Sequence, residues 1–172
     1  MNLSLESSTV RSWETTDVAS LVTHGDNRNI WINLRDRFPH PYTARDGREF
    51  IRAARKMRPE TFFAIAVGGQ AVGAIGFVLQ SDVERVSAEV GYWLGESFWG
   101  RGIATEALIA ITRHGIERHG LTRLFAAPFA YNTASCRVLE KAGYVLEGTL
   151  RRSAIKDGRI VDQLQYAFVA PA

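Results

Sequence analysis

The chain has 172 residues, of which 46% are hydrophobic and 23% are charged, a composition typical of a globular protein with a buried core. We therefore expect one domain over residues 1–172. The formal net charge is only +3, and no run of five or more like charges occurs, so a basic tail for nucleic acid is not indicated.

Membrane, secretory and metal functions are also disfavoured. No stretch of 18 apolar residues occurs, and residues 1–11 are too polar for a signal peptide, so the expected location is the cytoplasm. The single cysteine, Cys136, cannot form an internal disulfide. No cluster of Cys and His has the spacing of a zinc site, and we expect no metal.

The first half of the chain predicts one strand, three helical segments and a hairpin. Pro39 and Pro41 must break the second helical segment, so an aromatic loop is expected there. Gly68 and Gly69 are typical of a tight turn between two apolar strands. In chain order the predicted elements are a strand at 10–13, helices at 17–24, 27–34 and 43–57, and strands at 62–67 and 71–79.

The second half alternates strands with helices. Residues 86–94 alternate in hydrophobicity, as a strand with one buried face does. The other predicted elements are a helix from the glycine segment to about 118, a strand at 124–127, a helix at 132–142 and two hairpin strands at 145–155 and 159–168. This order indicates a mixed α+β fold, with helices packed on a sheet.

A glycine-rich segment, residues 100–105, lies between a predicted strand and the start of an amphipathic helix. Backbone N–H groups at such a helix N-terminus bind phosphate, and Gly100 and Gly102 would let an anion approach the main chain. The segment lacks the Gly-Lys-Ser/Thr of an ATP-binding P-loop, and Thr105 replaces the third glycine of a dinucleotide fingerprint. Pyrophosphate recognition is therefore the favoured interpretation, with a simple connecting turn as the alternative.

The run EVGYWLGESFWGRGIATEA at 89–107 resembles the acetyl-CoA motif of the GNAT superfamily, particularly its RimJ/RimL-type branch. It is followed at the family's spacing by NTAS at 132–135 and LEKAGY at 139–144, and residues 36–42 resemble the acceptor-side loop of this branch. The resemblance implies a GNAT fold, with a central, mostly antiparallel twisted sheet of about seven strands and about four helices. Trp99 stands where the superfamily commonly has Gln or Arg, and Leu139 stands where many members carry a tyrosine acid.

The resemblance also implies roles for individual residues. The strand before the glycine segment would hold the pantetheine arm of acetyl-CoA, the glycine segment would hold the pyrophosphate, and an asparagine would hydrogen-bond the reactive end. The implied acetyl-CoA ligands are Trp93, Leu94, Trp99, Gly100, Arg101, Gly102, Ile103, Ala104, Thr105 and Asn132. Aromatic residues of the loop, which could equally be core residues, would line the acceptor pocket: Trp31, Phe38, His40 and Tyr42.

Acetyl transfer needs a neutral amine and a proton for the departing thiolate, and two residues are candidates for these tasks. Glu89 could accept the amine proton directly or through water, although a surface carboxylate on a strand is the plainer interpretation. Ser135 could donate to the thiolate, or it could simply cap a helix. Asn132 also has the sequence position of a helix N-cap.

These observations predict a coenzyme A-dependent N-acetyltransferase that acts on a primary amine, of a protein N-terminus or of a small molecule. The alternative is a catalytically silent acyl-CoA sensor or interaction module, and a nucleic-acid-binding protein ranks last. The sequence does not identify the acceptor, because fold and donor do not fix it. Strand ends near residues 163–169 could pair with a second subunit, as relatives are often dimers.

Overall fold

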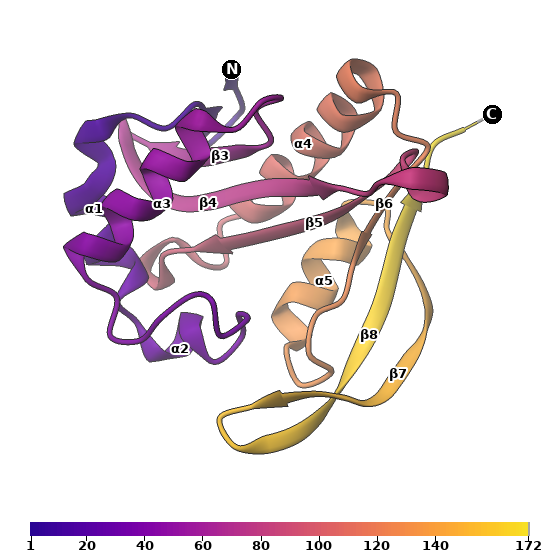
Figure 1. Ribbon diagram of the computed structural model, residues 1–172. Coiled ribbons are helices and arrows are strands. Elements are labelled where there is room, and N and C mark those ends of the chain that lie inside the picture. The colour runs from indigo at the N-terminus through magenta and orange to yellow at the C-terminus, as the bar shows by residue number, and fades with distance from the viewer. Residues whose placement is uncertain (172) are drawn as a thin grey trace. The chain divides into compact units, whose positions relative to one another are not determined.

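The computed structural model describes residues 1–171, which contain eight β-strands and five α-helices (Figure 1). The strands are β1 Asn2–Ser4, β2 Thr9–Arg11, β3 Phe62–Val67, β4 Gln70–Leu79, β5 Ser87–Leu94, β6 Arg123–Ala126, β7 Val145–Lys156 and β8 Arg159–Val169. The α-helices are α1 Val18–Gly25, α2 Arg28–Trp31, α3 Ala44–Lys56, α4 Ile103–His119 and α5 Thr133–Lys141.

The strands form one mixed sheet in the order β1-β2-β3-β4-β5-β6-β8-β7. Strands β1 to β3 pair antiparallel with their neighbours, as do β6 with β8 and β7 with β8, whereas β5 and β6 run parallel. The predicted mixed and mostly antiparallel sheet is therefore confirmed. The described residues contain one strand more than the seven that were predicted. This strand is β1, whose three residues lie in a mostly polar segment without a clear strand pattern.

The chain divides into two compact units. The first unit comprises Met1–Gly76 and Tyr92–Ala107, and the second comprises Phe77–Gly91 and the described residues from Leu108 onward. Because β4, β5 and α4 each pass from one unit into the other, the units are not consecutive along the sequence. The expectation of one domain over residues 1–172 stays a prediction.

Helices α1 and α3 lie side by side in the first unit, as Figure 1 shows, and pack on an apolar cluster. The start of α3 is fixed by a capping box, in which Thr43 Oγ1 accepts from Asp46 N and the Asp46 carboxylate accepts from Thr43 N. Trp13 meets Phe50 edge-on, with 5.3 Å between ring centroids. The buried members of this cluster are Trp13, Leu21, Tyr42, Ile51, Ala54, Ala64, Ala71 and Ala74.

The second unit packs the later turns of α4 and α5 on β6 and the β7–β8 hairpin. Gly115 of α4 is required by a close approach, because a Cβ there would lie 3.1 Å from Leu121 and 3.2 Å from Leu124. Two buried hydroxyls of this unit are paired with each other, those of Thr112 and Tyr144, which lie 2.7 Å apart. The fully buried side chains of this unit include Phe77, Leu108, Ile111, Leu121, Leu124 and Leu139.

Two expectations need correction. The helical segment predicted at 27–34 is only the four residues of α2, because Asn27 caps the helix and turns follow Trp31. The expectation that strand ends near 163–169 are open for a second subunit is wrong, because β8 lies between β6 and β7 and is paired on both sides. Dimerisation itself stays a prediction.

Candidate functional site

The glycine turn is the best-defined feature of the site. It follows the 3-10 helix η3, Glu96–Phe98, and leads directly into the 17-residue helix α4. Gly100 and Gly102 both have positive φ, +75° and +79°, and a Cβ at either would meet no atom within 4 Å. The first amide of the helix to bond backwards is Glu106 N, 3.0 Å from Gly102 O. The N–H groups of residues 103–105 precede it, and such groups form an anion site.

Side chains around the turn hold it in place. The indole Nε1 of Trp99 donates to Leu94 O at 2.7 Å, and the guanidinium of Arg101 lies over the Phe98 ring at 5.3 Å. The Glu106 carboxylate, in the first turn of α4, accepts from Ser7 N and, at 2.7 Å, from Ser8 Oγ. Glu106 is thereby tied to the β1–β2 connection. No local pattern predicts this contact, because about 100 residues separate its partners.

Strand β5 extends beyond the residues that pair with its parallel neighbour, β6. Its pairs with β6 are those of Ser87, Ala88 and Glu89, whereas β5 continues to Leu94. Trp93 O faces β4, because a Cβ added at Gly73 would collide with it. Backbone groups of successive strand residues point to opposite edges, so those of Leu94 face away from β4. Of the two predicted pantetheine partners, Leu94 therefore has the better orientation.

Asn132 and Ser135 lie together in the first turn of α5. Asn132 Oδ1 accepts from Ser135 N at 3.1 Å, which confirms the N-cap role. Within residues 1–171, the Asn132 side-chain amide nitrogen has no hydrogen-bond partner. One residue can thus cap the helix through its oxygen and still donate to a ligand through its nitrogen. Both Asn132 and Ser135 are half-buried.

We expect two substitutions to separate these roles of Asn132. Asn132→Asp keeps an oxygen that caps α5, so the free energy of unfolding should change by less than about 0.5 kcal/mol, but it removes the amide donor and should weaken acetyl-CoA binding. Asn132→Ala should weaken binding equally and also cost roughly 1 kcal/mol of stability. Urea unfolding and calorimetric titration measure the two effects. Unchanged acetyl-CoA affinity in both variants would remove Asn132 from the proposed binding site.

The four aromatic residues predicted for the acceptor pocket form two pairs. Phe38 and Tyr42 stack with centroids 4.7 Å apart and pack on the apolar cluster of the first unit, where Tyr42 is only 4% exposed. For this pair the geometry favours core packing. Trp31 and His40 lie 5.8 Å apart, outside that cluster.

Asp26, which the sequence analysis missed, holds this loop. Its Oδ1 accepts from Tyr42 N at 2.9 Å and lies 3.3 Å from His40 Nδ1. Asp26 directly follows α1, and its partners lie 14 and 16 residues further along the chain. An acidic residue at a helix end gives no sequence signal for such a contact.

The residues predicted for catalysis, donor binding and acceptor binding are divided between the two units. Glu89 is half-buried and is the last β5 residue paired with β6, opposite Phe125. Glu89, Asn132 and Ser135 belong to the second unit, while the glycine turn, Leu94 and the aromatic loop belong to the first. Leu139, at the position where many relatives carry a tyrosine acid, is fully buried in α5 and offers no proton.

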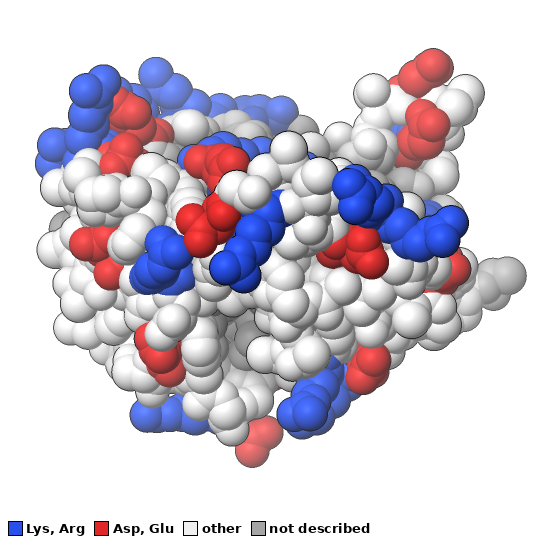
Figure 2. All heavy atoms as spheres, turned by 90° about the horizontal axis from the view of Figure 1, so that it is seen from below, with Lys and Arg blue, Asp and Glu red and all other residues white. Residues whose placement is uncertain are grey.

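The described residues also bear on other classes of function. Figure 2 shows Lys and Arg side chains interspersed with Asp and Glu on the face it displays, rather than a continuous basic surface. Within residues 1–171, no helix is long and apolar enough to cross a membrane. Across the same residues, no three His, Cys, Asp or Glu side chains are grouped so that they could hold a metal ion.

Comparison with known proteins decides the family. Residues 8–145 match the model of the acetyltransferase (GNAT) domain. The chain belongs to the GNAT family.

An uncharacterized N-acetyltransferase of Bacillus subtilis, YoaA, is 35% identical over 100 residues, which are 58% of this chain and 56% of that protein. The ribosomal-protein-serine acetyltransferase of Escherichia coli is 31% identical over 105 residues, 61% of this chain and 58% of that protein. Each match thus spans little more than half of the curated relative.

Solved GNAT structures share the fold over nearly the whole chain. The RimL ribosomal L7/L12 α-N-protein acetyltransferase in complex with coenzyme A has a TM-score of 0.87 at 21% identity, with 98% of both chains covered. Mycobacterium smegmatis RimJ, in complex with a CoA-disulfide, has a TM-score of 0.82 at 26% identity, covering 95% of this chain and 82% of that one. Together with the curated relatives, RimJ supports the RimJ/RimL-type branch.

Proposed function

We propose that the protein is an acetyl-CoA-dependent N-acetyltransferase that acts on a primary amine. The observation that carries the proposal is the glycine turn, in which two open glycines of positive φ lead directly into the N-terminus of α4. In a chain of the GNAT family, such a turn would hold the pyrophosphate of the donor. Solved relatives contain coenzyme A or acetyl-CoA, which supports this choice of ligand.

The donor would be held by main-chain and side-chain groups. Amides of residues 103–105 and the glycine turn would bind the pyrophosphate, with the guanidinium of Arg101 adding positive charge beside them. The Leu94 main chain would pair with the pantetheine arm, and the Asn132 amide nitrogen would donate to one of its carbonyls. Trp99 would act indirectly, by orienting the turn through its bond to Leu94 O.

The chemistry requires an amine nitrogen to attack the thioester carbon while the carbon–sulfur bond breaks. Glu89 would accept the proton that the amine loses, directly or through water. The departing thiolate would take a proton from the Ser135 hydroxyl or from solvent, since Leu139 replaces the tyrosine acid of many relatives. Acetyl-CoA supplies the activated acetyl group, and the protein supplies position and proton transfer.

The acceptor is proposed only as a class. The E. coli relative is named for a ribosomal-protein serine, and another GNAT structure, at 22% identity, is a microcin C7 self-immunity acetyltransferase. Both a protein N-terminus and a small-molecule amine therefore belong in the trial set. Trp31 and His40 would contact the acceptor, whereas Phe38 and Tyr42 would act as packed residues of the apolar cluster.

The proposal is tested by release of free thiol from acetyl-CoA in the presence of an amine panel. The panel contains peptides with free N-termini, amino acids, diamines and aminoglycosides, and acetylated products are identified by mass. We expect amine-dependent thiol release with at least one class. Saturable acetyl-CoA binding without thiol release for any class would favour the catalytically silent sensor instead.

A further inference from the structure

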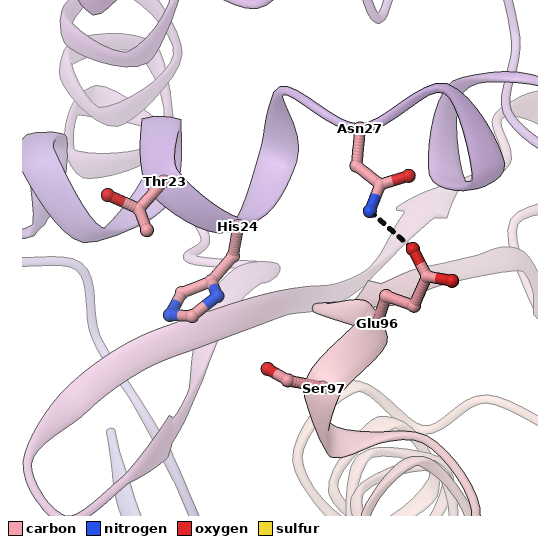
Figure 3. Close-up of a pocket in the computed structure, with 5 residues that line it drawn as sticks. All are labelled: Thr23, His24, Asn27, Glu96 and Ser97. Atoms are coloured by element: carbon pink, nitrogen blue, oxygen red, sulfur yellow. Dashed lines mark hydrogen bonds between the residues drawn. The ribbon is translucent and has the colours of Figure 1, made fainter.

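A pocket in the first unit is lined by polar residue types and includes none of the residues assigned to the donor. It has a volume of about 420 Å³ and is lined by Thr23, His24, Asn27, Glu96 and Ser97. The first three come from the end of α1 and the residues after it, and the last two from η3. Figure 3 shows the His24 side chain extending from α1 toward η3, and the Asn27 side chain hydrogen-bonded directly to the Glu96 carboxylate.

Glu96 gives the pocket a negative charge. Asn27 Nδ2 donates to its carboxylate at 2.6 Å and Asn29 Nδ2 donates at 3.0 Å, and these bonds hold the pKa of Glu96 below its ordinary value. Both donors are neutral amides, and within residues 1–171 Glu96 has no ion-pair partner. A carboxylate has about four acceptor sites, so two amide donors leave room for a further donor. The charge is therefore fixed and uncompensated.

His24 adds no positive charge at neutral pH. Its ring meets Phe98 edge-on at 5.4 Å, and partial burial lowers its pKa below the ordinary value. A neutral imidazole offers one donor and one acceptor nitrogen. Because the pocket is then anionic overall, it disfavours phosphates and carboxylates, and one carboxylate is too few to hold a divalent metal ion.

We propose that this pocket binds a positively charged group of the acceptor, separate from the amine that is acetylated. The inference rests on the proposed function, since only an acetyltransferase has an acceptor. Glu96 is close in sequence to the proposed donor site, because it lies two residues after Leu94 and three before Trp99. The ligand class is an acceptor with a second cation. It could be a small diamine, or a peptide with Lys or Arg near its free N-terminus.

The experiment compares acceptors that differ only in the second charge. The small-molecule pair is 1,5-diaminopentane and 1-aminopentane, and the peptide pair is Ser-Lys-Ala-amide and Ser-norleucine-Ala-amide. For wild type we expect kcat/KM to favour the dication about tenfold in one pair, the size of one charge-assisted hydrogen bond. Which pair shows the preference distinguishes a small-molecule acceptor from a peptide.

Glu96→Gln should reduce that ratio to about one, because the amide retains an acceptor for the asparagines but carries no charge. Glu96→Lys should reverse the preference, an outcome that misfolding cannot produce. Glu84→Gln, an exposed carboxylate of the second unit, is the matched control and should keep the wild-type ratio. A ratio near one for wild type in both pairs, or an unchanged ratio in Glu96→Gln, would overturn the proposal.

Failure of the proposed function would give a different result. If no acceptor is acetylated, titration of 1,5-diaminopentane and Ser-Lys-Ala-amide into wild type and Glu96→Gln still tests the pocket directly. Saturable binding of either by wild type that Glu96→Gln loses would support a cation site without catalysis. Equal binding by the two proteins, or no binding of either probe by wild type, would overturn it.

Discussion

Gly102→Glu should weaken acetyl-CoA binding by on the order of 100-fold or more, because several charge-assisted hydrogen bonds to phosphate are lost together. The substitution places a carboxylate at the N-terminus of α4, where the pyrophosphate would lie. It also forces a side chain onto a residue whose φ is +79°. Calorimetric titration of acetyl-CoA into the folded variant measures the loss.

Two control variants separate the charge from the strained backbone. Gly102→Ala imposes the same φ without a carboxylate and, because its Cβ would meet no atom within 4 Å, should lose much less affinity. Gly69→Glu places the same side chain on a glycine of similar φ, +83°, in the β3–β4 turn, and should bind acetyl-CoA normally. Normal binding by Gly102→Glu would contradict the pyrophosphate assignment.

Glu89→Gln should lower kcat by roughly 10²–10⁴-fold while leaving acetyl-CoA affinity unchanged, as expected when a general base is removed. Glutamine fills the same half-buried position at the end of the β5–β6 pairing but cannot accept a proton. Stopped assays of thiol release at saturating acetyl-CoA measure kcat, and titration measures affinity. Glu84→Gln, which changes an exposed glutamate of the same unit, is a control for the chemical change alone.

The pH dependence gives a second measurement for Glu89. An alkyl amine is mostly protonated below its own pKa, which is about 10.4 for a lysine side chain. The rate of a variant without a base therefore depends on the small fraction of amine that is neutral in solution. The rate of Glu89→Gln should therefore rise about tenfold per pH unit below that pKa, and the deficit against wild type should shrink. A constant deficit across pH, or a kcat close to that of wild type, would exclude Glu89 as the base.

The order of elements was predictable because it depends on local signals. Alternating apolar residues indicated β5, and the pairs Gly68-Gly69 and Asp157-Gly158 marked the two hairpin turns. The segment at 27–34 was wrong in extent, since its helical pattern is ended after one turn by the cap and the following turns. Strand β1 was missed because its three residues, with one apolar side chain between two polar ones, are too short a pattern to predict a strand without their pairing with β2.

The backbone geometry of the proposed donor site was predictable to a similar degree. Glycines ahead of an amphipathic helix specify backbone conformation and an exposed helix N-terminus, and both are properties of a short segment. The dual geometry of Asn132 was predictable in part, because an N-cap has a sequence signature. Its remaining amide donor follows only from the hydrogen bonds actually made.

The sequence alone determined the family-typical glycine turn, the mixed fold and the candidate residues for proton transfer. Only the tertiary structure decided that Trp93 O faces β4, that Glu106 is held by Ser7 and Ser8, and that Asn27 and Asn29 surround Glu96. These contacts join residues about 20 to 100 positions apart. Local sequence patterns encode conformation, whereas such contacts depend on which elements the whole chain brings together.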